Sequence, residues 1–407
     1  MNKFGLLGRK LSHSFSVPIH NRLGSYEYKL YEKEENEIEA FLKETDLSGM
    51  NVTIPYKKTV IPFCETLSDT AKKIGSVNTL VKKDGKWHGH NTDYFGFSYM
   101  VKSSGIEIKD KKVLILGSGG ASLTVKSVVE DMLAREIVVV SRSGENNYEN
   151  IYLHHDAQII INTTPLGMYP NCYDSPVKLS DFKNCEGVLD LIYNPANTML
   201  TFEAKNLGIP YANGLTMLTA QAKKAYELFF DKKTDDKVID KITEDIKKSS
   251  LNIVLVGMPG CGKTTVSRML SEITGKKLID CDEEIIKREK RSIEEIFEKE
   301  GEEYFRKAET QVIKDFSKES GYIISTGGGC VTREENYFPL KQNSCIFWLK
   351  RDIESLSTVG RPLSKTNKLS EMYEKRKPMY EKFSDFTVDN NKSIKETIKT
   401  ITEVLEK

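Results

Sequence analysis

Two glycine-rich loops in this chain have the composition and position needed to hold phosphate groups. The loop GSGGAS, residues 117–122, follows the apolar run KVLIL, and the loop GMPGCGKTT, residues 257–265, follows the apolar run NIVLV. Each run predicts a buried parallel strand. Backbone N–H groups of such loops, with the N-terminus of the next helix, bind phosphate oxygens. The sequence therefore predicts two nucleotide sites in one polypeptide.

The second loop fits the pattern G-x-x-x-x-G-K-[ST] of a P-loop, and TVSRMLSEIT after it predicts a helix. In this pattern the backbone surrounds the phosphates, the lysine reaches the β and γ oxygens, and the threonine hydroxyl binds Mg²⁺. We expect a nucleoside triphosphate and magnesium here. The predicted nucleotide-binding residues are Gly257, Gly260, Cys261, Gly262, Lys263, Thr264 and Thr265, and Thr264 is also a predicted metal ligand.

The stretch KKLIDCD predicts a strand that ends with two carboxylates, Asp280 and Asp282. Because a strand alternates its side chains, both would project to the same side. One of them would bind magnesium through water, and the other would contact the hydroxyl that accepts the phosphoryl group.

Four further motifs follow, namely FRKAE with Arg306, the GGG of residues 327–329, GRPL with Arg361 and RKPMY with Arg376. With them, residues 252–407 resemble shikimate kinases. The resemblance implies ATP as the donor and shikimate as the acceptor. It implies that Asp282, Arg306, Arg376 and the backbone of Gly328 and Gly329 bind shikimate, with Lys263 and Asp282 catalytic and Arg361 acting from a mobile lid. The predicted lid is short, and residues 357–360 lack an arginine often found upstream of RPL.

In the first loop, Gly117 allows a sharp turn, Gly119 lets the backbone approach a pyrophosphate, and residues 121–135 can form the following helix. The next predicted strand, REIVVV, ends in SRS, where a protein that binds NAD commonly has an acidic residue. A guanidinium beside hydroxyl groups suits a 2′-phosphate, so we expect NADP(H). The predicted cofactor residues are Gly117, Ser118, Gly119, Gly120, Ala121, Ser141, Arg142 and Ser143.

Lys57 follows the strand-like NVTI, and the loops GSVNTL and NTDYFG bring amide and hydroxyl side chains together with Asp93. Such loops are suited to polar recognition. A lysine paired with a carboxylate can exchange a proton with a carbonyl oxygen while the nicotinamide supplies hydride to the carbon. These residues predict reduction of a small carbonyl compound.

Eight motifs spread over the first unit resemble shikimate dehydrogenases: HSFS, NVTIPYK, GSVNTL, NTDYFG, GSGGAS, NTTPLGM, DLIYNP and NGLTMLTAQA. The resemblance implies that Lys57 and Asp93 form a catalytic dyad and that Gly214 and Met217 border the nicotinamide. The implied substrate-binding residues are Ser14, Ser16, Thr53, Asn78, Asn91, Tyr193 and Gln221. The chain departs from the family pattern at Val17, which stands where proline is usual, and in the short segment after Ser143, where a second basic residue is missing.

The chain of 407 residues is long enough for about two or three ordinary domains. We predict an α/β protein with an N-terminal substrate lobe (residues 1–102, completed by helices in 215–248), a Rossmann-like NADP lobe (103–214) and a P-loop kinase domain with a parallel sheet (249–407). The charged segment before residue 251 predicts a last helix that runs into a short linker at residues 248–250.

The composition excludes several kinds of partner. The 60 Lys plus Arg residues nearly balance the 59 Asp plus Glu residues, so we expect binding of neither nucleic acid nor an anionic membrane. The first residues lack an apolar signal run, no apolar stretch approaches the ~20 residues of a membrane span, and the seven cysteines form no CxxC pair. We expect a cytoplasmic protein that acts on small molecules, and the sequence leaves homo-oligomer formation open.

Together these features predict a bifunctional enzyme that reduces 3-dehydroshikimate with NADPH and phosphorylates the resulting shikimate with ATP. One alternative is a metabolite-sensing regulator built from the same domains, which should have lost catalytic groups such as Lys57 and Lys263. The other is an NAD-dependent quinate or shikimate dehydrogenase fused to a small-molecule kinase, against which Arg142 argues.

Overall fold

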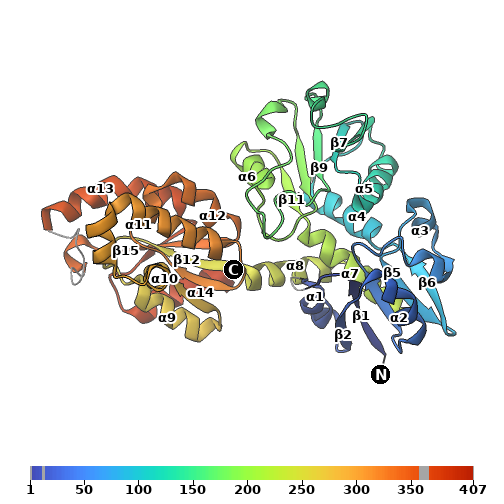
Figure 1. Cartoon of the computed structure of the whole chain (residues 1–407), viewed down its shortest axis with the longest axis horizontal. Helices are drawn as coiled ribbons and strands as arrows, with labels where there is room; N and C mark the ends of the chain where they lie inside the picture. Colours follow the sequence, from blue (N-terminus) through green and yellow to red (C-terminus); the bar gives the residue numbers. More distant parts are fainter. Residues whose placement is uncertain (1, 12–13, 357–365, 407) are drawn as a thin grey trace. The chain divides into compact units, whose positions relative to one another are not determined.

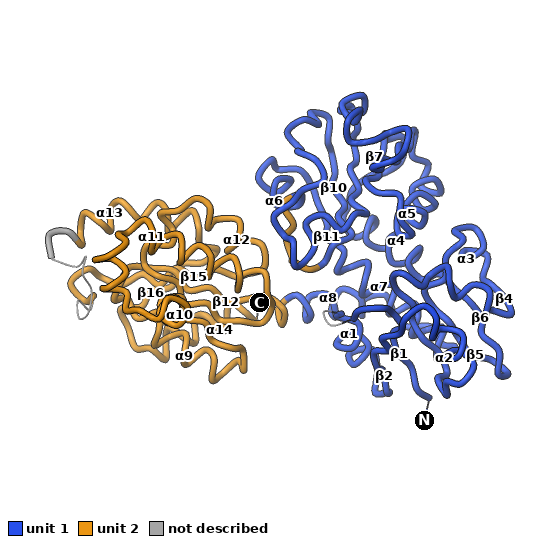
Figure 2. Tube along the Cα trace, in the orientation of Figure 1, with its two compact units in different colours: residues 1–193, 200–247 blue, residues 194–199, 248–407 orange. Residues whose placement is uncertain are grey.

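The computed structural model describes residues 2–11, 14–356 and 366–406, with backbone alone at 366–368. It divides into two compact units, shown in different colours in Figure 2. Unit 1 comprises Met1–Tyr193 and Leu200–Lys247, and unit 2 comprises Asn194–Met199 and Lys248–Lys407. Strands and helices alternate in both units (Figure 1), which confirms the predicted α/β class.

The strands of unit 1 are β1 (Lys3–Gly8), β2 (Glu27–Glu32), β3 (Gly49–Val52), β4 (Cys64–Leu67), β5 (Thr79–Lys83), β6 (Lys86–His90), β7 (Lys112–Leu116), β8 (Glu136–Val140), β9 (Ile159–Asn162), β10 (Gly187–Asp190) and β11 (Tyr211–Asn213). Those of unit 2 are β12 (Asn252–Val256), β13 (Lys277–Asp280), β14 (Tyr322–Ser325), β15 (Ser344–Lys350) and β16 (Phe386–Asp389).

The α-helices that begin in the first 250 residues are α1 (Ser16–Leu23), α2 (Ile38–Glu44), α3 (Asp69–Ile74), α4 (Asp93–Ser104), α5 (Gly120–Asp131), α6 (Met199–Asn206), α7 (Leu215–Phe230) and α8 (Lys237–Ser250). Those of the remaining chain are α9 (Lys263–Thr274), α10 (Cys281–Glu289), α11 (Ile293–Ser317), α12 (Tyr337–Gln342), α13 (Thr366–Phe383) and α14 (Ile394–Glu406).

The first sheet of unit 1 has the order β2-β1-β3-β5-β6-β4 and mixes parallel with antiparallel pairs. Helix α7 covers it, because Ala225 and Phe229 belong to the same core cluster as Phe4 and Leu6. The chain therefore returns, after the second sheet, to pack on the first. We keep the predicted division of unit 1 into a substrate lobe and a cofactor lobe as a working proposal.

The second sheet of unit 1 is wholly parallel, in the order β11-β10-β9-β7-β8. Strand β7 is buried on both faces: Val113 and Ile115 pack in the cluster with α4 and α5, whereas Leu114 and Leu116 pack in the cluster with α6. This alternation is the reason that the strand reads as a continuous apolar run. Helix α5 spans residues 120–131, whereas the sequence predicted a helix over residues 121–135. The helix therefore ends four residues earlier than predicted.

The sheet of unit 2 is also parallel, in the order β13-β14-β12-β15-β16. Figure 1 shows α9 and α14 on one face of it and α11, α12 and α13 on the other. The central strand β12 is buried along its whole length. Its carboxyl end leads into the P-loop, where the ends of β13 and β14 also converge.

The predicted linker at residues 248–250 is wrong, because α8 continues to Ser250 and a single residue separates it from β12. The buried Ile239, Ile242 and Ile246 line one side of this helix. Lysine, glutamate and aspartate dominate the rest, and the two serines at the end do not break a helix as glycine or proline would. The high charge of the segment reflects the polar side of an amphipathic helix.

In the part of the chain that the structure describes, no helix combines the length and the apolar character that crossing a bilayer requires.

Candidate active sites

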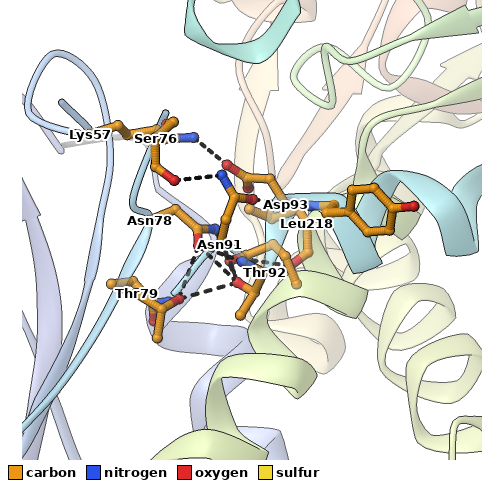
Figure 3. A network of polar contacts seen from close by, with 11 residues as sticks. Lys57, Ser76, Asn78, Thr79, Asn91, Thr92, Asp93 and Leu218 are labelled. Carbon is orange, nitrogen blue, oxygen red and sulfur yellow. Dashed lines mark hydrogen bonds and ion pairs between the residues drawn. The ribbon is translucent and has the colours of Figure 1, made fainter. Parts of the chain in front are cut away.

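Lys57 and Asp93 meet in unit 1 (Figure 3). Lys57 follows β3, Asp93 stands in the first turn of α4, and Lys57 Nζ donates to Asp93 Oδ2 over 2.6 Å. Their side chains are 21% and 12% exposed, so the pair is sheltered yet open to a small molecule. The N-terminus of α4 stabilises the carboxylate, since the helix dipole is positive there. This geometry supports the predicted dyad.

Asn78 and Asn91 lie beside the dyad in a network of hydrogen bonds (Figure 3). Asn78 Oδ1 accepts from the backbone N–H of Thr92 over 2.6 Å, and Asn78 Nδ2 donates to Gln221 Oε1 over 3.5 Å. Asn91 Nδ2 donates to the carbonyl oxygen of Ser76 over 2.9 Å. The structure thus brings three predicted substrate residues to the same place: Asn78 directly before β5, Asn91 directly after β6, and Gln221 in α7.

Two predicted serines and a tyrosine form a second group in unit 1. Ser14 Oγ donates to Ser16 Oγ over 3.0 Å, and the ring of Phe15 between them lies 5.4 Å from the ring of Tyr193. Burial raises the pKa of Tyr193, so its phenol stays protonated. Thr53 is fixed through its backbone, which donates to the carbonyl oxygen of Leu7 over 2.9 Å. His13 of the HSFS motif lies outside the described residues.

Gly96, Thr79 and Thr92 support this site but were missed by sequence reasoning. A Cβ on Gly96 would lie 2.7 Å from the carbonyl oxygen of Met217, so glycine lets α4 approach α7 closely. Thr79 and Thr92 are buried, and Thr79 Oγ1 donates to Asn78 Oδ1 over 3.2 Å. All three residues stand inside the quoted motifs, but a sequence cannot distinguish ligand-binding hydroxyls from supporting ones.

The first glycine loop has the form that a pyrophosphate site needs. Gly117 adopts a φ of 104°, which favours glycine, and a Cβ on Gly119 or Gly120 would meet open space. Strand β7 pairs in parallel with β8, with Leu116 opposite Val140, so the segment 141–143 lies next to the loop. The residues therefore fit a dinucleotide whose 2′-phosphate is near Arg142. Between β8 and β9, a stretch that the structure describes completely, there is a 3-10 turn (Ile151–His154) and no α-helix.

Gly214 and Met217 lie at the start of α7. A Cβ on Gly214 would overlap the carbonyl oxygen of Leu191, so the position admits glycine alone. Met217 is 9% exposed and packs in the core cluster of α4 and α5. Both residues lie beside the second sheet of unit 1, and their contact with the nicotinamide stays a prediction.

The P-loop of unit 2 is built on left-handed glycines. Gly257, Gly260 and Gly262 have φ values of 149°, 83° and 98°. Lys263 is the first residue of α9, and its ammonium donates to the carbonyl oxygens of Gly257 (2.8 Å) and Met258 (3.1 Å). Thr264 Oγ1 donates to Asp280 Oδ2 over 3.0 Å. A hydroxyl paired with a carboxylate beside a phosphate cradle fits magnesium, which prefers oxygen ligands.

Asp282 does not belong to a strand, so the predicted alternation with Asp280 is wrong. Strand β13 ends at Asp280, which caps α10 by accepting from the N–H groups of Asp282 and Glu283. Asp282 stands in the first turn of that helix. The Asp282 side chain still reaches the GGG loop of residues 327–329, because a Cβ on Gly327 would lie 3.3 Å from Asp282 Oδ1. Aspartate is a favoured helix cap, a signal that the sequence reading overlooked.

Arg306 and Glu309 form a buried ion pair against the GGG loop. Arg306 Nη1 donates to Glu309 Oε2 over 2.7 Å, and a Cβ on Gly329 would overlap the guanidinium. Glu309 is fully buried, and burial outweighs the nearby cation and raises its pKa. Sequence reasoning missed Glu309, although its spacing of three residues from Arg306 on a helix could have indicated a pair.

Arg376 and Tyr380 come from α13 to the same loop. Arg376 Nη1 and the Tyr380 hydroxyl both donate to the carbonyl oxygen of Gly328, over 3.0 Å and 2.5 Å. This fixes the peptide between Gly328 and Gly329, the predicted backbone ligand. Tyr380 was also missed by sequence reasoning. Arg361, the predicted lid residue, lies outside the described residues, as do residues 357–360.

Comparisons with known proteins find relatives of two enzyme families along the chain. The family model "Shikimate dehydrogenase substrate binding domain" matches residues 6–80, and the model "Shikimate kinase" matches residues 259–406. An NADP(+) shikimate dehydrogenase of Clostridium perfringens is 38% identical over 268 residues, which is 61% of this chain and 99% of that protein. One of Clostridium beijerinckii is 38% identical over 260 residues, 58% of this chain and 95% of that protein.

Two solved structures cover the same region. Shikimate dehydrogenase 1 from Peptoclostridium difficile matches with a TM-score of 0.57 and 37% identity, over 61% of this chain and 98% of that chain. A chorismate mutase/shikimate 5-dehydrogenase fusion from Clostridium acetobutylicum matches with a TM-score of 0.58 and 35% identity, over 61% of this chain and 98% of that chain.

Proposed function

The chain belongs to the shikimate dehydrogenase family over 61% of its length and carries a shikimate kinase domain after that region, and we propose that it catalyses two consecutive reactions. In the first, NADPH reduces 3-dehydroshikimate to shikimate. In the second, ATP phosphorylates the 3-hydroxyl of shikimate. The observation that carries this proposal is that both constellations, the Lys57–Asp93 pair and the P-loop with its acceptor pocket, are present in one chain.

For the reduction, NADPH supplies hydride to the carbonyl carbon of the substrate. Lys57, held by Asp93 at 2.6 Å, supplies the proton to the carbonyl oxygen, and the product is an alcohol. Asn78, Asn91 and Gln221 bind hydroxyl groups of the ring, since amides can donate and accept. Ser14 and Ser16 bind its carboxylate. Thr53 and Tyr193 are the remaining residues that we propose to contact the substrate.

For the phosphorylation, ATP supplies the phosphoryl group. Asp282 accepts a hydrogen bond from the substrate hydroxyl and takes its proton, while Arg306 and Arg376 bind the carboxylate of shikimate. Lys263 and the P-loop N–H groups stabilise the charge that develops on the transferred group. Thr264 and Asp280 would hold magnesium, Asp280 through water, and the resemblance assigns Arg361 a role in stabilising the transferred charge.

The second site uses the product of the first, and this ordering defines the test. The purified chain is supplied with 3-dehydroshikimate, NADPH, ATP and Mg²⁺, and NADPH oxidation and ADP release are followed together. We expect ADP release from 3-dehydroshikimate to depend on NADPH, and ADP release from shikimate to be independent of it. Tight binding of both ligands without turnover would instead indicate a metabolite sensor.

The partners in this proposal are small molecules, and we place the enzyme in the cytoplasm. The scattered cysteines contain no CxxC pair, which fits a reducing compartment. Light scattering of the purified chain will determine whether it forms a homo-oligomer.

A further inference from the structure

Arg351 lies directly after β15, at the carboxyl ends of the parallel strands of unit 2, where the P-loop also begins. Strand β15 runs parallel to β12 with Trp348 opposite Val256, and a Cβ on Gly257 would lie 2.6 Å from the carbonyl oxygen of Leu349. At the other end of the P-loop, a Cβ on Gly262 would lie 3.8 Å from Arg351 Nη1. The guanidinium therefore lies beside the residue that precedes α9, where the phosphate cradle ends.

Arg351 has no acidic partner among the residues that the structure describes. The side chain is half-buried, and its Nε is buried without a hydrogen-bond acceptor. The neighbouring carboxylate of Asp352 accepts from Asn391 Nδ2 over 3.2 Å. A buried N–H without an acceptor costs free energy, so such a group in a native protein requires an explanation.

Other arginines of unit 2 make the contrast clear. Arg268 pairs with Glu283 at 3.2 Å, and Arg288 with Asp315 at 2.7 Å. Both are satisfied by protein carboxylates. Arg351, beside the phosphate cradle, has no such carboxylate partner among the described residues.

Asn390, the other side chain at this end of the loop, is already satisfied. Its Nδ2 donates to the carbonyl oxygen of Cys261 over 2.6 Å, and its Oδ1 accepts from Thr397 Oγ1 over 2.6 Å. Asn390 therefore holds the loop in shape, whereas Arg351 keeps a donor free for a ligand.

We propose that Arg351 is a nucleotide-binding residue, which donates to a phosphate oxygen of the nucleotide held by the P-loop. This inference rests on the proposed kinase activity. A guanidinium presents its N–H groups in a planar fork that matches the oxygens of a phosphate. Arg351 thus adds a second cation to that of Lys263, with its Nη1 placed beside Gly262 at the end of the phosphate cradle.

The test compares Arg351→Gln with the wild-type chain. We expect the KM for ATP to rise about 10- to 100-fold, the range for a charge-assisted hydrogen bond. The KM for shikimate, the kcat at saturating ATP and the dehydrogenase rate should stay within about twofold. Inorganic tripolyphosphate and ADP, tested as competitors of ATP, should both lose affinity by a similar factor, because the contact is to phosphate.

Arg268→Gln is the matched control, since it removes an arginine of α9 that is paired at the surface with Glu283. It should leave the KM for ATP unchanged. If Arg351→Gln raised the KM for shikimate as well, its fold would be affected, and Arg351→Lys would then decide. For Arg351→Lys, a rise of about 3- to 10-fold in the KM for ATP supports the guanidinium contact. A wild-type KM for ATP in Arg351→Lys overturns the proposal.

Two results with Arg351→Gln would overturn the proposal. One is an unchanged KM for ATP in an active variant. The other is weakened ADP binding with unchanged tripolyphosphate binding, which would place the contact on the nucleoside. A wild-type chain without kinase activity would instead contradict the proposed function, so the two failures are distinguishable.

Discussion

Lys57 and Asp93 are 36 residues apart in the chain, yet Nζ and Oδ2 lie 2.6 Å apart. The lysine comes from the segment after β3 and the aspartate from the first turn of α4, so two separately formed elements of one unit create the pair. Because both side chains remain partly exposed, a carbonyl compound can reach the ammonium while the carboxylate keeps it in position.

Replacing Lys57 by alanine should slow reduction of 3-dehydroshikimate by roughly 10²- to 10⁴-fold, the usual contribution of a positioned acid or base. Kinase turnover of the same purified protein should be unchanged and serves as an internal standard. The exposed neighbour Lys58 gives the control, Lys58→Ala, which should reduce normally. Reduction at the wild-type rate by Lys57→Ala would remove this residue from the mechanism.

Arg142→Ala should weaken NADPH binding by about 10- to 150-fold and NADH binding little, because a charge-assisted contact to the 2′-phosphate is worth about 1.5–3 kcal/mol. The KM for each cofactor measures this preference. Arg135→Ala removes an exposed arginine of the same unit and should alter neither value. Equal losses for both cofactors would assign Arg142 a structural role.

Tyr380→Phe should raise the KM for shikimate by about 3- to 10-fold, because the carbonyl oxygen of Gly328 loses its 2.5 Å donor and the peptide to Gly329 becomes freer. The KM for ATP should stay near the wild-type value, since Arg376 and the P-loop are untouched. A drop in melting temperature with unchanged KM values would indicate a structural role alone. Tyr304→Phe removes a hydroxyl that bonds Glu289 at the surface and is the matched control.

His20 predicts a pH dependence of the stability of unit 1. Complete burial lowers the pKa of His20 to about 3, while its ring stacks on Tyr28 at 3.7 Å and accepts from or donates to Tyr26. An unfolded histidine titrates near pKa ~6.5, so between about pH 6.5 and 3 the unfolded chain binds a proton that the native chain does not. This contribution to stability is present above pH ~6.5 and is lost as the pH falls.

From pH 6.5 to 5 the loss should reach about 2 kcal/mol, at ~1.4 kcal/mol per pH unit for one group. Urea unfolding followed by dehydrogenase activity measures it in the wild type and in His20→Gln, whose amide does not titrate. The variant should show a shallower decline with falling pH. Identical slopes for the two proteins would mean that His20 is not held neutral.

A fragment of residues 249–407 should phosphorylate added shikimate without reducing 3-dehydroshikimate. It keeps the end of α8, where Lys276 Nζ donates to the carbonyl oxygens of Ser249 (2.7 Å) and Leu251 (2.9 Å). A fragment of residues 252–407 loses both acceptors of the Lys276 ammonium, together with the contacts that hold them in place. We expect it to melt about 2–8 °C lower, for a loss of about 1–2 kcal/mol. Turnover by 249–407 that needs added residues 1–248 would contradict independent folding.

The sequence alone determined the fold class, both phosphate loops and the residue types at each site. These properties are local: an apolar run followed by glycines dictates a buried strand and a left-handed turn, and the lysine after Gly262 must open the next helix. The family motifs then indicated Lys57, Asp93 and the arginines of the kinase. The same local reasoning failed at residues 280–282 and 248–250, where helix capping and an amphipathic pattern replaced the expected strand and linker.

Only the tertiary structure decided which side chains support the predicted ones. The structure shows three such contacts: Glu309 with Arg306, Tyr380 with Gly328, and Arg351 with Gly262. In the sequence alone, Glu309, Tyr380 and Arg351 look like ordinary surface or core residues. Residue type limits what a side chain can bind, but the partner depends on how elements distant in the chain pack together. That packing is set by the summed burial of many apolar side chains, and no short stretch of sequence contains it.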